Sequence, residues 1–287
     1  MEKVDQVIAT IARKAYIAPE LVTPITAFAS NLSEEIGTSK QTVNVPILAA
    51  GAAKTLTVGS KYVCEGDLST TDVKLTDRLY SGFDFEDETF KVLSDHLILN
   101  TFSAEVRKIL ATMNAKVAAA VKAGVTNTAE FAPTLEGLAA LKSVCSNKKM
   151  FNDLVLVLKP ETYDKLAASK ELMQLIAISG KDTVTTGVVP LLLGFKIVRT
   201  NADQEFVAYR DAIAVAARAT PATTTSQTII DEASGFALNA KVLQMEDQAS
   251  VSMIAEAFFG CKIVDATRII KLTAPTTVTP TEPSETV

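Results

Sequence analysis

The stretch SDHLILNTFSAEVRKILATMNAKVAAAVKA, residues 94–123, predicts one uninterrupted α-helix. It contains neither proline nor glycine, and Ser94 and Asp95 can cap its start. Gly124 follows at the position where a left-handed stop is expected. At the standard rise such a helix is about 45 Å long, which exceeds the diameter of a small domain. This length suits either the spine of an elongated subunit or a long core helix in an α/β enzyme.

Apolar side chains recur along this segment at intervals of three and four residues, which places them on one face of the helix. They are Ile98, Phe102, Val106, Ile109, Met113, Val117 and Val121. Glu105, Lys108, Lys116 and Lys122 lie off this face. Alanine is frequent in the second half, so another stretch of backbone could approach the helix closely there.

The composition describes a soluble globular protein. The chain has 287 residues, 48% hydrophobic and 21% charged, which suffices for the core of one large or two modest domains. No apolar run is long enough to span a membrane. The segment MEKVDQVIATIARKAY carries acidic residues and lacks the pattern of a secretory signal, which predicts a protein made and kept in the cytoplasm. The net charge of −5 argues against general affinity for nucleic acid.

The residue types that carry most enzyme chemistry are scarce. Cys64, Cys145 and Cys261 lie far apart and form no CxxC pair, which predicts reduced thiols rather than a disulfide framework or a zinc site. His96 is the only histidine, so a multi-histidine metal site is not expected, and any Ser-His-Asp or Cys-His scheme would depend on it. We interpret it as a helix-surface or packing residue.

No motif or cluster predicts a catalytic, cofactor-binding or metal-binding site. The sequence contains no phosphate-binding loop and no GxGxxG or GxSxG motif. Asp84, Glu86, Asp87 and Glu88 form an acidic cluster. Their spacing, along an expected strand and the start of a helix, favours a solvated or ion-paired edge over a metal site.

Residues 51–87 are the most distinctive region before the long helix. Short strand-like pieces alternate there with polar turns and supply too little apolar surface for an independent core. We expect a long two-stranded hairpin that stands off the body, and such a hairpin needs a cover, which points to a neighbouring subunit. Ahead of it, residues 43–47 alternate in a strand that Pro46 restricts to the edge of a sheet.

After the long helix, the pattern is mixed. It predicts helices over residues 134–146 and from Pro160 to Ala168, separated by a strand over 151–158 that is buried on both faces. Residues 210–220 fit either a strand or a helix. Residues 236–272 are β-rich, and the Thr/Pro-rich tail that follows has the composition of a disordered segment unless a partner holds it.

The order of these elements resembles the Hong Kong 97 fold of the major capsid proteins of tailed double-stranded DNA phages. The segment AEAFFGCKIVDATRIIKL is similar to the final strands of that family, and VCEGDLSTTDVKLTDRLYSGFDFEDE is similar to its extended loop. The resemblance implies an α+β fold with an N-terminal arm, an extended β-hairpin loop, a peripheral domain with a long spine helix, and an axial domain. The implied ranges are 1–50 for the arm, 51–87 for the loop, 88–150 and 236–272 for the peripheral domain and its return strands, 151–235 for the axial domain, and 273–287 for the tail.

The function implied by the resemblance is structural rather than enzymatic. Copies of the chain would assemble into the hexamers and pentamers of an icosahedral phage head that encloses double-stranded DNA without sequence-specific binding. Candidate partners are a separate scaffold protein, a portal protein and a decoration protein, with no membrane. The protein would be assembled in the host cytoplasm and reside in the virion.

Two other functions stay open. One is an encapsulin-type nanocompartment shell around a cargo enzyme, which shares the fold. The other is an α/β enzyme with Cys64 or Cys145 as nucleophile and His96 as base.

Four charged residues are candidates for contacts between subunits. Lys61 and Arg78 lie on the expected loop, with Asp84 and Glu86 as acidic counterparts. Exposed ion pairs contribute little individually, so apolar burial by the arm and the loop is expected to dominate the association.

Overall fold

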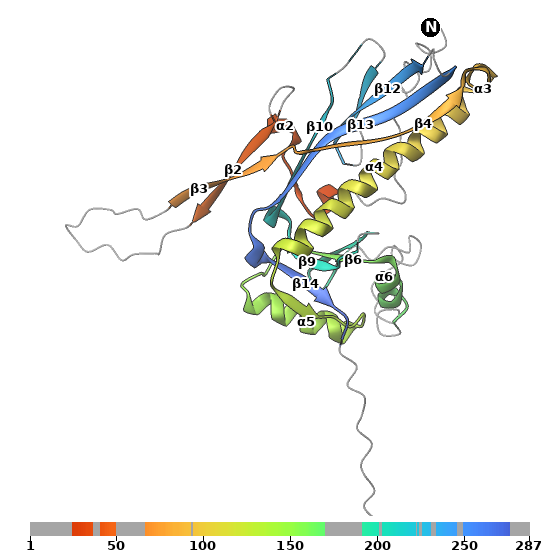
Figure 1. Ribbon diagram of the computed structural model, residues 1–287. Helices are drawn as coiled ribbons and strands as arrows, with labels where there is room; N and C mark the ends of the chain where they lie inside the picture. Colours follow the sequence, from red (N-terminus) through yellow and green to blue (C-terminus); the bar gives the residue numbers. More distant parts are fainter. Residues whose placement is uncertain are drawn as a thin grey trace, which may run out of the picture.

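The computed structural model describes residues 25–36, 41–49, 67–92, 94–169, 191–200, 203–221, 223, 226–230, 234–245 and 249–275. These ranges leave out the segment MEKVDQVIATIARKAY, the residues Lys61 and Cys64, and most of the Thr/Pro-rich tail. Figure 1 shows a large sheet lying along a long helix, a smaller lobe at the end of that helix, and a two-stranded ribbon that projects to one side.

The long helix is α4 (Asp95–Gly124), and its extent matches the prediction from the sequence, but Ser94 at its N-cap forms no side-chain capping hydrogen bond. All seven residues of the apolar stripe are between 0 and 2% exposed, so the helix buries the expected face. The predicted left-handed stop at Gly124 is wrong, because Gly124 belongs to the helix and the capping residue Val125 is extended (φ −108°). A Cβ atom at Gly124 would lie 2.8 Å from Cδ1 of Ile263. The nearest obstacle to a side chain at this position is therefore the flexible end of Ile263 and not the backbone of its strand.

The large sheet is built around the longest strand, β13 (Ser250–Ile263). β4 (Asp77–Glu86) pairs with one edge of it, from Glu86 opposite Ser250 to Asp77 opposite Phe259. The other edge changes partner part-way, because β12 (Ala237–Met245) pairs with residues 250–256 and β10 (Ile213–Ala219) with residues 257–263. β11 (Ser226–Ile230) and β1 (Ser30–Asn31) extend the sheet beyond β12 and β10. One face of this sheet and the stripe of α4 form the main core.

The smaller lobe has its own sheet and core. The strand order is β5 (Thr128–Glu130), β14 (Ile269–Thr273), β9 (Phe206–Tyr209), β6 (Leu154–Leu158), β8 (Phe195–Arg199) and β7 (Leu191–Leu192). α5 (Leu135–Asn147) and α6 (Pro160–Ala167) occur at the two predicted places, and the Thr134 hydroxyl caps α5 by accepting from the Gly137 N–H at 3.1 Å. Every residue of β6 is buried, as its apolar sequence predicted.

The projecting ribbon pairs β2 (Thr42–Ala49) with β3 (Asp67–Lys74) in antiparallel register. In the described part of the chain β3 is the only partner of β2, so Pro46 lies in an edge strand as predicted. The hairpin expected within residues 51–87 is therefore wrong in its pairing, since its first strand begins earlier and β4 belongs to the large sheet. The pattern of β4 alternates because one of its faces packs on the core. That alternation would also fit a hairpin strand.

The remaining helical elements in the described ranges are short. These are η1 (Ile25–Ala27), α2 (Ser33–Ile36), α3 (Asp87–Val92), η2 (Arg210–Ala212) and η4 (Ala266–Arg268). Residues 210–220, for which the sequence left two alternatives, form η2 and then β10. Among the helices in the described ranges, none has the length and apolar character needed to cross a bilayer. The division of the chain into arm, loop, peripheral and axial domains stays a prediction.

Candidate functional site

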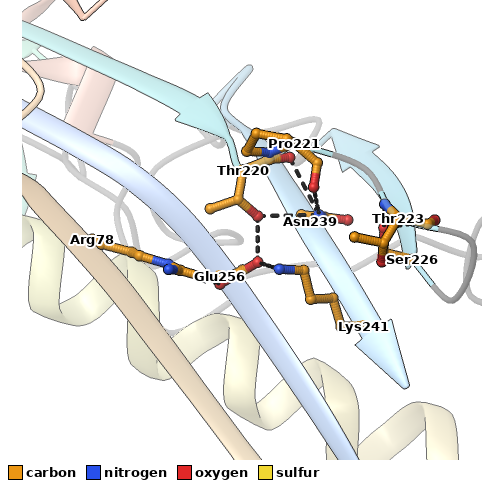
Figure 2. A network of polar contacts seen from close by, with 8 residues as sticks. All are labelled: Arg78, Thr220, Pro221, Thr223, Ser226, Asn239, Lys241 and Glu256. Carbon is orange, nitrogen blue, oxygen red and sulfur yellow. Dashed lines mark hydrogen bonds and ion pairs between the residues drawn. The ribbon is translucent and has the colours of Figure 1, made fainter. Parts of the chain in front are cut away.

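A cluster of polar side chains surrounds Glu256 at the middle of β13 (Figure 2). Its neighbours Ala255 and Ala257 belong to the core, so Glu256 lies on the opposite face of the strand, where it is nonetheless only 3% exposed. Arg78 donates to Oε2 of Glu256 through Nη2 at 2.6 Å and Nε at 3.1 Å. Lys241 and the Thr220 hydroxyl both donate to Oε1.

The cluster lies where β13 changes partner from β12 to β10. Asn239, the residue opposite Glu256 on β12, donates from Nδ2 to the carbonyl oxygens of Thr220 at 3.2 Å and Pro221 at 3.3 Å. It thereby connects the end of β10 to the start of β12. Because Arg78 comes from β4 and Thr220 follows β10, the cluster joins four strands at the point where β13 changes partner from β12 to β10.

The surroundings of Glu256 keep its carboxylate ionised. Burial raises the pKa of Glu256, but hydrogen bonds from Lys241, Thr220 and Arg78 and the charge of Lys241 outweigh it, so the pKa lies below its ordinary value. One carboxylate faces two cations, and the cluster therefore carries one net positive charge. The Arg78 side chain is 57% exposed, so the cluster reaches the protein surface at Arg78.

A second buried carboxylate connects β4 to the long helix. Glu105 of α4 accepts from the Ser81 hydroxyl at 2.5 Å and pairs with Lys108 at 2.7 Å. Burial raises the pKa of Glu105, and these contacts lower it further than burial raises it. Its place off the apolar stripe suggested a surface residue, yet it is only 5% exposed because β4 covers it.

The four predicted contact residues have different environments. Arg78 belongs to the Glu256 cluster, and Asp84 accepts from the Ser252 hydroxyl at 2.5 Å, so both have partners within the chain. Glu86 is exposed at the end of β4, opposite Ser250, and Lys61 lies outside the described residues. The structure thus brings Arg78, Asp84 and Glu86 onto one strand of the large sheet. Their contact with a second subunit stays a prediction.

Sequence reasoning missed Glu256, Lys241 and Glu105. One signal was available for Glu256, which interrupts the apolar run SMIAEAFF as its only charged residue. A charge at such a position is rarely buried unless other groups pair with it.

The thiols in the described ranges are poor nucleophiles. Cys145 is fully buried, and burial raises its pKa to about 11. Burial and the charge of Asp77 also raise the pKa of Cys261. The side chain of His96 and the whole of Cys64 lie outside the described residues. Within those residues, no group of three or more His, Cys, Asp or Glu side chains could hold a metal ion.

Comparison with known proteins identifies the fold. No protein-family model matches the sequence, and no curated protein sequence matches it. Solved structures do match, and one is from Mycobacterium phage Che8 (TM-score 0.56, 16% identity, 88% of this chain and 91% of that one). Another is the capsid of cyanophage P-SCSP1u (TM-score 0.58, 13% identity, 88% of each chain). The chain has a phage capsid fold.

The resemblance to the Hong Kong 97 family is thereby confirmed at the level of the fold, which is α+β. A virus-like particle from Pyrococcus furiosus shares this capsid fold (TM-score 0.52, 12% identity, 94% of this chain and 98% of that one). The three likenesses extend over nearly the whole of each chain. They therefore concern the complete architecture and not one common motif.

Proposed function

We propose that this chain is a shell subunit, the major capsid protein of a phage head. The observation that carries the proposal is the match to capsid structures across about nine-tenths of both chains. Fold alone does not specify function, so the physical character of the surface has to support the same conclusion.

The β2–β3 ribbon supports self-assembly because, among its described side chains, the fully buried ones lie at its base. Val43, Val73 and Leu75 pack there against Ala214 and Ala216 of β10. Farther along, Asn44, Pro46, Ser69, Thr70 and Asp72 are exposed, and the other described side chains are only partly buried. Two-stranded ribbons are marginally stable in water by themselves, and a neighbouring subunit would supply the missing cover.

The finer features of the proposal follow from the family resemblance. Copies would form hexamers and pentamers around double-stranded DNA, with a separate scaffold protein, a portal protein and a decoration protein as partners. Assembly would take place in the host cytoplasm, and the protein would function without enzymatic activity. The buried, protonated thiol of Cys145 supports this last point, since a nucleophilic cysteine requires an accessible thiolate.

A second candidate function is a nanocompartment shell that encloses a cargo enzyme. The likeness to the Pyrococcus furiosus virus-like particle favours it, because the match covers 98% of that chain. The two functions differ in what the shell encloses.

Negative-stain microscopy of the expressed protein, alone and together with the products of neighbouring genes, tests the proposal. We expect closed polyhedral particles or rings of subunits. A uniform monomer under every condition would contradict a shell function and favour the enzyme hypothesis. Nuclease-resistant DNA in particles from infected cells would support the phage head, whereas a co-purifying enzyme would support the nanocompartment.

A further inference from the structure

β4 is an edge strand that buries little of its own surface. In the described part of the chain β13 is its only strand partner, and its side chains alternate between partly buried and exposed, with none fully buried. The core-facing residues of β13, from Val251 to Phe259, are instead 0–1% exposed. Leu79, Phe83 and Phe85 of β4 pack against that core only in part. Polar links to the neighbouring elements therefore matter more for β4 than for the strands inside the sheet.

Buried carboxylates form such links on both faces of β4. On the face away from α4, Arg78 of β4 donates to Glu256 of β13 through two nitrogen atoms. On the other face, where β4 runs along α4 (Figure 1), the Ser81 hydroxyl donates to Glu105 at 2.5 Å, and Glu105 also pairs with Lys108 of its own helix. Glu256 and Glu105 are 3% and 5% exposed. Both links to β4 thus depend on a buried acceptor that acid can protonate.

Cations surround Glu256 from three strands. Arg78 contacts it from β4 and Lys241 from β12, and Arg218 of β10 lies on the same face of the sheet, opposite Phe258. Protonation of Glu256 removes the negative charge that holds Arg78 and Lys241 together, and the two cations then repel each other. The carboxylate that fastens β4 at neutral pH therefore leaves a repulsive contact in acid.

Two carboxylates of β4 itself lie nearer to the solvent. Asp77 pairs with Lys116 of α4 at 3.0 Å, and their side chains are 38% and 37% exposed. Asp84 is exposed and accepts from the Ser252 hydroxyl at 2.5 Å. Exposed polar pairs contribute little individually, so the two buried carboxylates dominate the response of β4 to acid.

We propose that β4 is an acid-sensitive strand: when Glu256 and Glu105 are protonated, β4 detaches from β13 and α4 while the rest of the large sheet and the smaller lobe stay folded. β13 keeps β12 and β10 on its other edge, and the smaller lobe has its own core. The change takes place within one chain and does not require the proposed shell function. β3 ends at Lys74 and β4 begins at Asp77, so the β2–β3 ribbon is attached to the moving strand. In a shell, acid would also act on the contacts of the ribbon, and this last step rests on the proposed function.

The direction of the pH dependence follows from the two carboxylates. Burial raises the pKa of Glu256 and of Glu105, but their hydrogen bonds and cationic neighbours lower it further, to below the ordinary 4.5. Detachment of β4 removes the contacts from Arg78 and Ser81, so the detached state takes up protons more readily. The links are therefore present above pH 4.5 and are lost as the pH falls through the folded pKa. In that window the population of detached β4 rises by up to about tenfold per pH unit for each carboxylate.

Hydrogen exchange of the full chain between pH 7 and pH 3, measured by mass spectrometry and corrected for the intrinsic exchange rate, tests the proposal. We expect peptides from β4 to lose protection below pH 4.5 while peptides from β12 and β6 keep theirs. Unchanged protection of β4 down to pH 3, or loss of protection in all three strands together, would overturn the proposal. The measurement needs no assembly, so such a result leaves the shell function intact, and a chain that stays monomeric in microscopy leaves the acid-sensitive strand intact.

Two variants assign the effect to Glu256. Arg78→Gln removes the link from the side of β4, and we expect its β4 to be about tenfold less protected at pH 7 and to change less with pH than in the wild type. Lys116→Gln is the matched control, because it removes an exposed ion pair to the same strand, and its β4 should exchange as in the wild type. Equal loss of protection in the two variants, or an undiminished pH dependence in Arg78→Gln, would overturn the role of Glu256.

Discussion

Gly260 shows how one missing methyl group allows two segments to pack. A Cβ atom there would lie 2.2 Å from the carbonyl oxygen of Lys74, and a backbone obstacle of this kind cannot rotate away. We expect Gly260→Ala to lower the free energy of unfolding by about 2 kcal/mol, as overpacking does. Gly124→Ala is the control, because its obstacle is the flexible end of Ile263 and helix propensity favours alanine by about 1 kcal/mol. Urea unfolding of both variants measures the difference, and equal losses would contradict this account.

Glu256 makes the stability of the folded protein depend on pH. Its pKa in the folded protein lies below the ordinary value of 4.5, so its contribution is present above that pH and is lost as the pH falls through the folded value. Glu105 acts in the same direction. Glu256→Gln leaves Lys241 and Arg78 without a counter-charge, and we expect a loss of about 3 kcal/mol at pH 7.

Thermal unfolding at pH 7 and pH 3 measures this effect. The difference in stability between the two pH values should be smaller in Glu256→Gln than in the wild type. Arg268→Gln serves as a comparison, because both Arg268 and its partner Asp265 are exposed and we expect its removal to change stability by less than about 1 kcal/mol. If Glu256→Gln had the same pH dependence of stability as the wild type, the cluster would not contribute to that dependence.

At the scale of elements, α4 carries the main core. Ile109 is 2% exposed in the middle of its stripe, so Ile109→Ala removes buried methyl groups and leaves a cavity. We expect a loss of about 3 kcal/mol in the free energy of unfolding. Thr112→Ala, on the exposed face of the same helix, should stay within about 0.5 kcal/mol of the wild type. Denaturant titration compares the two, and similar losses would mean that the stripe is not the packing face.

The same elements show what could be predicted from the sequence. The apolar period of α4, the cap of α5 and the apolar run of β6 are local signals, and each predicted its element correctly. The place of β4 could not be predicted in this way. The alternation of apolar and polar residues in β4 indicates only that one face of the strand is buried. Its partner strand β13 lies about 170 residues later in the chain and is selected by tertiary packing.

The candidate site was less predictable than the fold for a related reason. The sequence predicted that Arg78 would pair with Asp84 or Glu86 between subunits, and that contact stays a prediction. Its carboxylate partner Glu256 comes from β13, and Lys241 comes from β12. Such a cluster depends on the register of strands that are distant in sequence. The local sequence signal for this cluster is the glutamate within an apolar strand.

At the scale of the whole molecule, the β2–β3 ribbon can be separated from the body, which is the large sheet with α4 together with the smaller lobe. The two have separate requirements for stability. The body has two extensive cores, whereas the ribbon is anchored through Val43, Val73 and Leu75 at its base. The body should therefore fold whether or not the outer part of the ribbon is present. Assembly should require that outer part, because the described side chains of the ribbon beyond its base are exposed or only partly buried.

Replacing residues 46–70 with a short Gly/Ser linker tests this separation. The paired residues Val45 and Thr71 remain on either side of the linker, and the three anchoring residues are retained. We expect the midpoint of thermal unfolding to stay within a few degrees of the wild type, since a loss below 1 kcal/mol shifts a chain of this size by only about 2–4 °C. Particle formation should disappear in sedimentation and microscopy. Shells that still form would show that the ribbon is dispensable for assembly, and a body that no longer folds would show that the ribbon is part of its core.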